Sequence, residues 1–231
     1  MKSPAPTVGT LCDPVLMDLG VPHGFGCRGA DVPASTRLPR QVHGTALWDA
    51  FSGSRAGEEP EEPAEADVVL GCGGARRSVG IVTADCVPIL ASAAEGEAVV
   101  AIHAGWRGLA AGVIEKGLSA LRDAAGAGSI RAAIGPAARG CCYEVDEPVR
   151  AALSERYGSL LDREVIAPRR PGHFRLDLSR LAERIVRESG VSEACLGTRH
   201  RVCTICDPVR FESHRRDGAR AGRLRHFITT V

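Results

Sequence analysis

Residues 79–90 read VGIVTADCVPIL, in which two short β-branched runs flank a polar Ala-Asp-Cys turn. Similar apolar runs occur on either side of this segment, at residues 66–70 (ADVVL) and 98–102 (AVVAI). Runs of about four to eight apolar residues bounded by turn residues are typical of buried strands. We therefore expect residues 66–70, 79–83, 87–90 and 98–102 to form a central β-sheet.

Helical patterns follow the predicted sheet. In residues 108–124, apolar side chains recur at three- and four-residue steps, as on the buried face of an amphipathic helix. Two more helices are predicted at residues 147–157 and 179–189. Asp177 or Ser179 is expected to cap the start of the second one.

The remaining segments complete a single layered domain. Residues 131–134 and 227–231 are predicted strands, and the acidic, proline-containing residues 52–66 form a loop. Residues 1–20 are expected to be a weakly ordered start before one catalytic domain over residues 21–231. Helices and strands alternate irregularly, which favours an α/β to α+β fold with a mixed central β-sheet flanked by helices.

Composition limits the classes of partner. The chain has 231 residues, of which 44% are hydrophobic and 25% charged, and a formal net charge of +1. These values fit one globular domain with a substantial core. The balanced charge gives no bulk attraction to nucleic acid or to an anionic membrane, so neither is an expected partner. Nothing in the composition indicates an oligomeric state.

Features of exported and membrane proteins are missing from the sequence. The first residues (MKSPAP) lack the apolar stretch of a secretory signal, and the longest apolar run, residues 79–94, is interrupted by Asp85 and Pro88. Nine cysteines at irregular spacing favour reduced thiols in the cytoplasm over a disulfide framework. Four of them are interpreted as small buried hydrophobic side chains: Cys12, Cys72, Cys141 and Cys195.

Three other patterns have simpler explanations than the function they suggest. Residues 24–29 (GFGCRG) match a dinucleotide-binding turn, but residues 30–33 (ADVP) do not begin the helix that such a turn requires. Residues 203–206 (CTIC) have the spacing of half a zinc site or a redox pair, but no second pair of ligands stands nearby in the sequence, so buried cysteines are preferred. The arginine-rich residues 210–225 have few aromatic neighbours, which favours a solvated face or a small-anion site over nucleic acid.

Three polar side chains stand where their apolar or glycine-rich surroundings would not require them. They are His43 in QVHG, Cys86 in TADCVP and His103 in IHAGWRG, and the last two follow or end predicted strands. Imidazole nitrogen and thiolate are good zinc ligands, and three of them leave a fourth position for water or substrate. Their spacing is long and irregular, so buried core histidines and a buried thiol stay an alternative.

These segments resemble the laccase-domain family, whose members are also described as multicopper polyphenol oxidases, purine nucleoside phosphorylases or peptidoglycan editing factors. The resemblance lies in residues 83–90 (TADCVPIL), 100–108 (VAIHAGWRG), 134–136 (IGP) and 142–145 (CYEV). It extends over nearly the whole chain, including residues 23–25, 28, 41–44, 66–67, 203–204, 213–218 and 222–223.

The resemblance implies a mixed α/β layered fold and a zinc ion bound by His43, Cys86 and His103. It also implies phosphorolysis of adenosine, inosine, guanosine and methylthioadenosine, together with deamination of adenosine. Phosphorolysis needs a grip on phosphate, for which arginine is well suited. The candidates are Arg28, Arg107, Arg216 and Arg223, each of which can equally be a surface or ion-pair arginine.

Asp85 has two possible roles beside Cys86. It can act as a proton shuttle in deamination, or it can orient a histidine ligand. The chain departs from the family pattern in two places: residues 29–40 replace a longer segment, and residues 211–214 (FESH) replace a Phe-Phe-Ser-Tyr pattern. The second departure is expected to alter the wall of the pocket.

Three other functions compete with the zinc phosphorylase. A copper oxidase is less favoured, because multicopper centres use many histidines, and the chain has only seven with no His-x-His pair. A hydrolase with Cys86 as nucleophile, activated by His103 with Asp85 nearby, would suit the peptidoglycan-editing description. A non-catalytic nucleoside-binding or metal-binding module is the third alternative.

Overall fold

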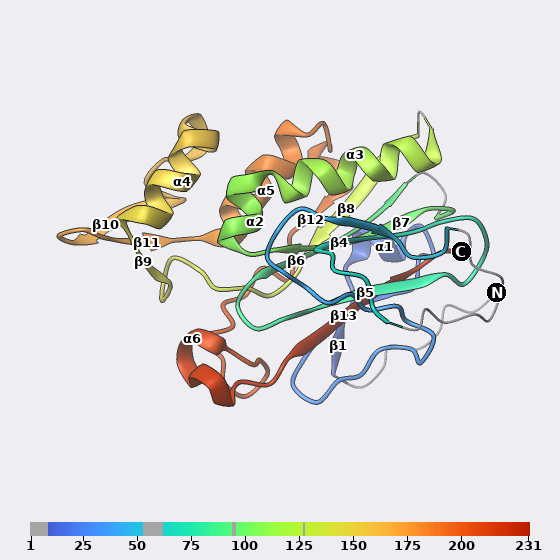
Figure 1. Ribbon diagram of the computed structural model, residues 1–231, viewed down its shortest axis with the longest axis horizontal. Coiled ribbons are helices and arrows are strands. Elements are labelled where there is room, and N and C mark those ends of the chain that lie inside the picture. The colour runs from blue at the N-terminus through green and yellow to red at the C-terminus, as the bar shows by residue number, and fades with distance from the viewer. Residues whose placement is uncertain (1–8, 53–61, 94–95, 127) are drawn as a thin grey trace.

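Two β-sheets pack against each other in the computed structural model, which describes residues 9–52, 62–93, 96–126 and 128–231 (Figure 1). The larger sheet is mixed, with parallel pairs at both edges and antiparallel pairs between them. Its order is β12 (Leu196–Gly197), β8 (Ile130–Ile134), β6 (Val87–Ala93), β7 (Val99–Ala104), β4 (Val68–Gly71) and β3 (Leu47–Asp49). The smaller sheet is antiparallel, in the order β1 (Thr10–Leu11), β2 (His23–Gly26), β13 (Leu224–Thr229) and β5 (Ser78–Thr83).

Helices cover the outer face of the larger sheet, as Figure 1 shows for α2 (Trp106–Ala111), α3 (Val113–Ala125) and α5 (Leu178–Glu188). Strand β7 illustrates why its first four residues, 99–102, are all apolar. Val100 and Ile102 pack toward the helices, whereas Val99 and Ala101 pack toward the smaller sheet. Because successive side chains of a strand point to opposite faces, a strand covered on both sides reads as a continuous apolar run.

A third, smaller sheet extends from one end of the molecule (Figure 1). Its order is β10 (Ile166–Arg170), β11 (His173–Leu176) and β9 (Glu144–Asp146). Helix α4 (Glu147–Tyr157) directly follows β9. The other described elements are short: α1 (Pro14–Met17), α6 (His214–Asp217) and the 3-10 turns Gly158–Leu160, Glu193–Cys195 and Gly218–Arg220.

The predicted mixed α/β layered fold is confirmed, with two differences in detail. The predicted helix over residues 108–124 is wrong as one element: α2 and α3 are separated at Gly112, whose φ of +88° is a left-handed conformation that suits glycine and interrupts the helix. The prediction of one central sheet is also wrong, because β5 pairs with β13 in the smaller sheet. Periodicity could not reveal this, since β5 is buried in either arrangement.

Order begins earlier than the sequence pattern indicated. The described residues Thr10–Leu11 form β1, and Pro14–Met17 form a helical turn that is capped by Asp13 and buries Leu16. Residues 1–8 of the predicted weakly ordered segment, and residues 53–61 of the predicted acidic loop, lie outside the described residues. Within the described part of the chain, no helix combines the length and the apolar character that crossing a membrane requires.

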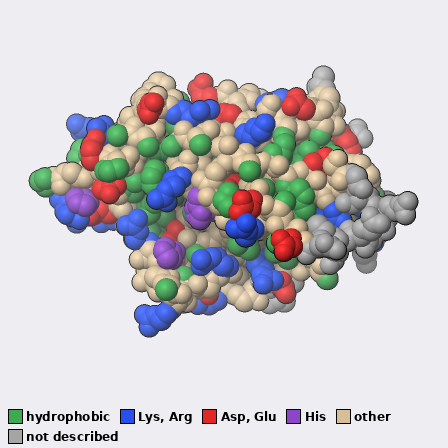
Figure 2. Space-filling view, viewed as in Figure 1, with side chains coloured by type: hydrophobic (Ala, Val, Ile, Leu, Met, Phe, Trp, Pro, Cys, Tyr) green, Lys and Arg blue, Asp and Glu red, His purple; other side chains and the backbone are tan. Residues whose placement is uncertain are grey.

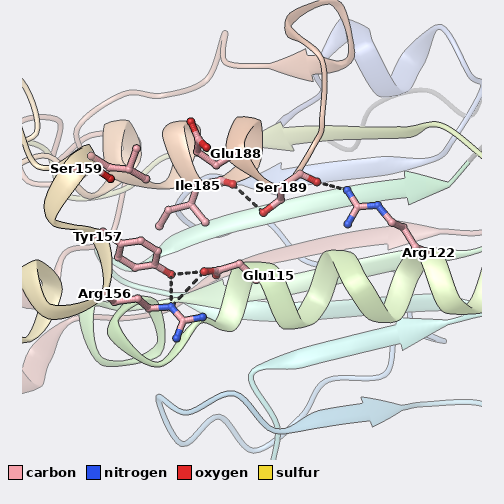
Figure 3. Close-up of a pocket in the computed structure, with 9 residues that line it drawn as sticks. Glu115, Arg122, Arg156, Tyr157, Ser159, Ile185, Glu188 and Ser189 are labelled. Carbon is pink, nitrogen blue, oxygen red and sulfur yellow. Dashed lines mark hydrogen bonds and ion pairs between the residues drawn. The ribbon is translucent and has the colours of Figure 1, made fainter.

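A hollow between α3, α4 and α5 is occupied by side chains that bind one another (Figure 3). The hydroxyl of Tyr157 donates to Glu115 at 2.8 Å, and Nε of Arg156 donates to the same carboxylate at 3.2 Å. Arg122 donates to the carbonyl oxygen of Ser189. No histidine or cysteine is among the residues that line it. These contacts tie the helices together, and the candidate site lies elsewhere.

Candidate functional site

Three side chains singled out in the sequence, those of His43, Cys86 and His103, converge in the structure. Their ligand atoms all lie within 4.8 Å of one another. His103 lies in β7 opposite Pro88 of β6, Cys86 lies in the short link from β5 to β6, and His43 lies in the loop between β2 and β3. The two imidazole rings are almost perpendicular, with centroids 4.9 Å apart. The group therefore forms where the chain crosses from the smaller sheet to the larger one.

Asp67, immediately before β4, fixes the geometry of this group. Its carboxylate is fully buried and lies 2.7 Å from Nδ1 of His103. It also accepts the backbone N–H groups of His43 and Gly44, at 3.0 and 2.7 Å. A carboxylate on one ring nitrogen of a histidine orients the other nitrogen for a ligand. Asp67 was not among the residues predicted for the site; the available signal in the sequence was an acidic residue within the apolar run 66–70.

The backbone at the site is strained. His43 and Asp85 adopt φ values of +61° and +93°, which residues other than glycine rarely adopt. Such conformations cost about 1 to 3 kcal/mol each and are found mainly where the surrounding structure imposes them, often at functional sites. For His43, the hydrogen bond from its amide to Asp67 supplies that constraint.

Gly105 provides the space that the group occupies. A Cβ atom at this position would lie 3.0 Å from Sγ of Cys86 and 3.2 Å from Cδ2 of His43. The φ of Gly105 is −76°, which any residue can adopt. Its lack of a side chain is therefore needed for packing at the site and not for its backbone conformation.

Electrostatics favour a thiolate at Cys86. Burial opposes the charged form, but hydrogen bonds from His103 and His43 lower the pKa of Cys86 to about 6. For His103, burial again opposes the charge, while Asp67 and Cys86 raise its pKa to about 9. A thiolate between two imidazoles, one of them braced by a carboxylate, is a donor set that fits a divalent metal ion.

A pocket of about 420 Å³ opens over these residues. His43 is exposed within it, whereas His103 is buried at its base. On the face shown in Figure 2, acidic and basic side chains are mixed, and histidine side chains lie close to Lys or Arg side chains. The pocket is lined by Gln41, His43, Val82, Thr83, Ala84, Asp85, Cys86, His103, Tyr143, His214, Arg215 and Arg223.

Comparison with known proteins places this arrangement in a family. A family model described as multi-copper polyphenol oxidoreductase laccase matches residues 27–231. The chain belongs to this family. A purine nucleoside phosphorylase of Xylella fastidiosa is 36% identical over 193 residues, covering 84% of this chain and 71% of that protein. A purine nucleoside phosphorylase of Aquifex aeolicus is 40% identical over 143 residues, covering 60% of this chain and 59% of that protein.

The fold of this laccase-family chain matches a solved structure over its full length. The crystal structure of the hypothetical protein YfiH of Bacillus licheniformis superposes with a TM-score of 0.83, covering 100% of this chain and 98% of that one. The two sequences are 22% identical, so this likeness concerns the fold alone. Membership of the family and the His and Cys side chains together indicate that the chain binds metal.

Of the four candidate arginines, Arg223 lines the pocket. Arg215, which was not among the predicted candidates, also lines the pocket, and its guanidinium lies over the ring of Tyr143 at 4.7 Å. The departure from the family pattern at His214 also falls on the pocket wall, as expected. Two cations and a histidine therefore face the space above Cys86.

The other three candidate arginines lie outside this pocket. Arg28 forms an ion pair with Glu212 at 2.7 Å, and Arg216 donates to backbone carbonyls, including that of Phe211 at 3.0 Å; both line a separate hollow. Arg107 stacks on Trp106, at 4.4 Å from the ring, in a hollow next to the pocket.

Asp85 lines the pocket, but its carboxylate is fully engaged by loops of the C-terminal third. It accepts hydrogen bonds from the hydroxyl of Thr204 at 2.6 Å, from the hydroxyl of Ser213 at 3.0 Å and from the amide of Arg215 at 2.7 Å. The residue that contacts a histidine ligand is Asp67. Asp85 therefore positions the segment that carries Arg215.

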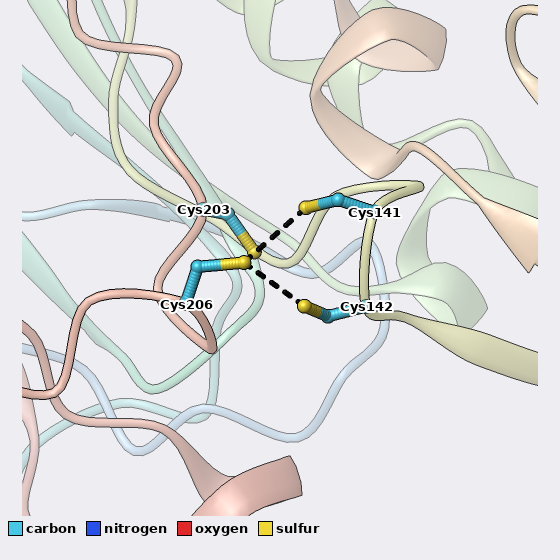
Figure 4. A group of neighbouring side chains, drawn as sticks. All are labelled: Cys141, Cys142, Cys203 and Cys206. Atoms are coloured by element: carbon cyan, nitrogen blue, oxygen red, sulfur yellow. Dashed lines mark hydrogen bonds between the residues drawn. The ribbon is translucent and has the colours of Figure 1, made fainter.

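The interpretation of the cysteines needs correction. Cys141 is exposed, not buried, while Cys12, Cys72 and Cys195 are partly buried. The preference for buried cysteines at residues 203–206 is also wrong: Cys206 is exposed, and Cys141 and Cys142, distant in the sequence, lie beside Cys203 and Cys206 (Figure 4). The two pairs are about 60 residues apart in the chain, so their spacing in the sequence could not reveal the contact.

Proposed function

We propose that this chain is a zinc-dependent purine nucleoside phosphorylase that acts on adenosine, inosine, guanosine and methylthioadenosine. The observation that carries the proposal is the convergence of His43, Cys86 and His103 at the base of a pocket that also receives Arg215 and Arg223. The names of the relatives support the same reaction. Phosphate and a purine nucleoside are the proposed partners, and the nine free cysteines suit the reducing cytoplasm.

The reaction transfers a glycosyl group to phosphate. A phosphate oxygen forms a bond to C1′ of the ribose while the bond from C1′ to the purine nitrogen breaks. The base leaves with the bonding electron pair and takes up a proton, which gives the free base and the sugar 1-phosphate: ribose 1-phosphate, or its 5-methylthio analogue from methylthioadenosine. The site must therefore hold a doubly charged anion beside the sugar and stabilise negative charge on the leaving base.

Arg215 and Arg223 are placed to hold the phosphate. Both line the pocket, and within the described part of the chain Arg223 donates to the backbone carbonyls of Ala221 and Gly222. A guanidinium can bind phosphate through two parallel hydrogen bonds, which fixes its orientation as well as its charge. Stacking on Tyr143 limits the movement of Arg215.

The remaining tasks are to orient the ligand residues and to polarise the substrate. Asp67 holds His103 in one orientation and keeps the His43 loop in place. A zinc ion bound by His43, Cys86 and His103 would act as a Lewis acid with one coordination position open to the substrate. Copper would suit the family description, but a donor set for one ion does not make a multicopper centre. Adenosine deamination at the same site is the finer part of the proposal. Because the Asp85 carboxylate already accepts three hydrogen bonds, we assign it the positioning of Arg215 and not the proton shuttle.

One geometric observation favours a second candidate. Asp67, His103 and Cys86 form a line of hydrogen-bonded side chains, as in a hydrolase whose thiolate nucleophile is activated by a braced histidine. The second imidazole argues for the metal site, because a nucleophile needs one base and His43 also bonds the sulfur. Metal analysis separates the candidates, since a bound zinc occupies the sulfur and removes it from a nucleophilic role.

The decisive experiment is chromatography of adenosine and inosine incubated with the purified protein, with and without phosphate. We expect free base only when phosphate is present, and its loss in Cys86→Ala. Cys195→Ala, which alters a cysteine outside the site, serves as the control and should keep wild-type activity. Conversion of adenosine to inosine, read in the same runs, reports deamination.

Two outcomes would overturn the proposal. Equal product formation by the wild type and Cys86→Ala would show that the activity does not come from this site. Binding of nucleoside without turnover, measured by calorimetry under the same conditions, would instead support a non-catalytic binding module.

A further inference from the structure

A second group of metal-binding side chains lies outside the pocket, in two turns that meet on the surface. Cys141 and Cys142 belong to the turn before β9, and Cys203 and Cys206 to the loop between β12 and α6. Figure 4 shows the four side chains directed toward one another from these two segments. All four sulfur atoms lie within 4.8 Å of one another.

The separations of the four sulfur atoms, from 2.9 Å to at most 4.8 Å, span the value expected for four ligands around one ion. A zinc–sulfur bond of about 2.3 Å in tetrahedral geometry places the sulfurs about 3.8 Å apart. The sulfur of Cys206 lies 3.5 Å from that of Cys141 and 2.9 Å from that of Cys142. Both separations are longer than the ~2.05 Å bond of a disulfide. Four ligands also close the coordination shell, as in structural zinc sites.

The backbone prepares these turns for the cluster. Ala137 and Cys203 form a parallel β-bridge, in which the amide of Thr204 donates to Ala137 O at 3.1 Å. The amides of Cys142 and Tyr143 both donate to the carbonyl of Arg139, at 2.9 and 2.8 Å, which folds the first turn. The two pairs of cysteines are thus brought together by hydrogen bonds that do not involve sulfur.

Two backbone amides are directed at the sulfur of Cys203. They are those of Cys206 and Arg139, and each donates a hydrogen bond to it. The amide of the fourth residue donating to the sulfur of the first is a direct consequence of the tight Cys-x-x-Cys turn. An amide pointed at sulfur stabilises the charged ligand that a metal ion requires.

We propose that Cys141, Cys142, Cys203 and Cys206 bind a second zinc ion, which acts as a structural clasp between the two turns. The clasp would fix two walls of the pocket. Cys142 precedes Tyr143, on which Arg215 stacks at 4.7 Å, and Cys203 precedes Thr204, whose hydroxyl donates to Asp85. The inference does not depend on the reaction catalysed in the pocket.

Metal analysis of purified variants tests the clasp. We expect the wild type to contain one equivalent of zinc more than Cys141→Ser or Cys206→Ser, and Cys195→Ser to match the wild type. The double variant His43→Ala/Cys86→Ala, in which the pocket ligands are removed, should keep one equivalent. This variant keeps the test valid if the cysteine variants do not fold.

A spectroscopic measurement identifies the ligands. Cobalt(II) added to the metal-free double variant should give the visible absorption of a tetrahedral tetrathiolate, and Cys206→Ser in that background should abolish it. Three results would overturn the inference: a double variant without metal, iron in place of zinc, or a mass spectrum of anaerobically purified protein with a disulfide between the two turns. If Cys86→Ala loses phosphorolysis but retains the clasp metal, the four cysteines bind their metal independently of the reaction in the pocket.

Discussion

The two groups of metal-binding side chains differ in the elements that carry them. His43, Cys86 and His103 sit on or next to strands of two packed sheets, and a buried carboxylate orients one of them. The four cysteines sit in two surface turns, with Cys141 and Cys206 exposed. With a metal ion bound, three ligands under a polar pocket would leave a coordination position free for substrate, whereas four thiolates would complete the coordination. The proposed roles of the two sites, catalytic and structural, follow from this difference.

Asp67→Asn should give the largest effect and separate the two groups. Without the carboxylate that holds His103, we expect zinc affinity at the pocket to fall about 10- to 100-fold, as for other residues that orient metal ligands. The four-cysteine site should keep its metal. Competition with a chelator, followed by metal analysis, measures both. Asp13→Asn, which alters another buried carboxylate, should leave both affinities unchanged; equal loss in the two variants would contradict the assigned role.

Arg223→Ala sharpens the contrast between binding metal and binding substrate. Loss of a charged hydrogen bond worth about 1.5 to 3 kcal/mol should raise the KM for phosphate about 10-fold or more, without loss of metal. Initial rates at varied phosphate concentration provide the measurement. Arg150→Ala, on the exposed face of α4, is the matched control. An unchanged KM for phosphate in Arg223→Ala would remove this arginine from the phosphate site.

The strands beneath the pocket should respond to pH through His226. This fully buried side chain in β13 bonds Thr83 at the end of β5, and burial followed by the charge of His103 lowers its pKa to about 3. An unfolded chain gains a proton near pH 6.5 that the folded chain does not take up until about pH 3. The contribution of His226 to the free energy of unfolding is therefore complete above pH 6.5. Acidification below pH 6.5 reduces the free energy of unfolding by about 1.4 kcal/mol per pH unit.

Urea unfolding between pH 7 and pH 4 measures this slope. His226→Gln should remove it, because glutamine retains hydrogen-bonding groups and has no proton to gain. His173→Gln, at a partly exposed position on β11, is expected to leave the slope as in the wild type. If His226→Gln shows the wild-type slope, the pH dependence originates in other groups.

Gly105→Ala should give the smallest effect. The added methyl group would crowd Cys86 and His43 at 3.0 and 3.2 Å, and overpacking of about 1 kcal/mol corresponds to roughly a 5-fold loss of zinc affinity at the pocket. Gly158→Ala, where nothing lies within 4 Å of the new atom, is the control. Calorimetric zinc titration compares the variants, and equal affinities would mean that the site relaxes around the methyl group.

The sequence predicted the elements that local patterns encode. Strand β8 and helices α4 and α5 lie within a residue of their predicted positions, because hydrophobic period and capping residues act over a few residues. The three-residue strand β9 and the hairpin β10–β11 were missed, since short and mostly exposed strands carry little apolar pattern. Gly112 divided a helix whose apolar period continued across it.

The sequence by itself determined which side chains can bind metal and which runs become buried strands, since both depend on residue chemistry and short-range pattern. Only the tertiary structure decided three features. Strand β5 joins the smaller sheet, Asp67 and not Asp85 is hydrogen-bonded to a histidine of the site, and two cysteine pairs from distant turns lie together. The physical reason is that these contacts join segments far apart in the chain. No local period or spacing records them, because each depends on how the sheets and loops pack.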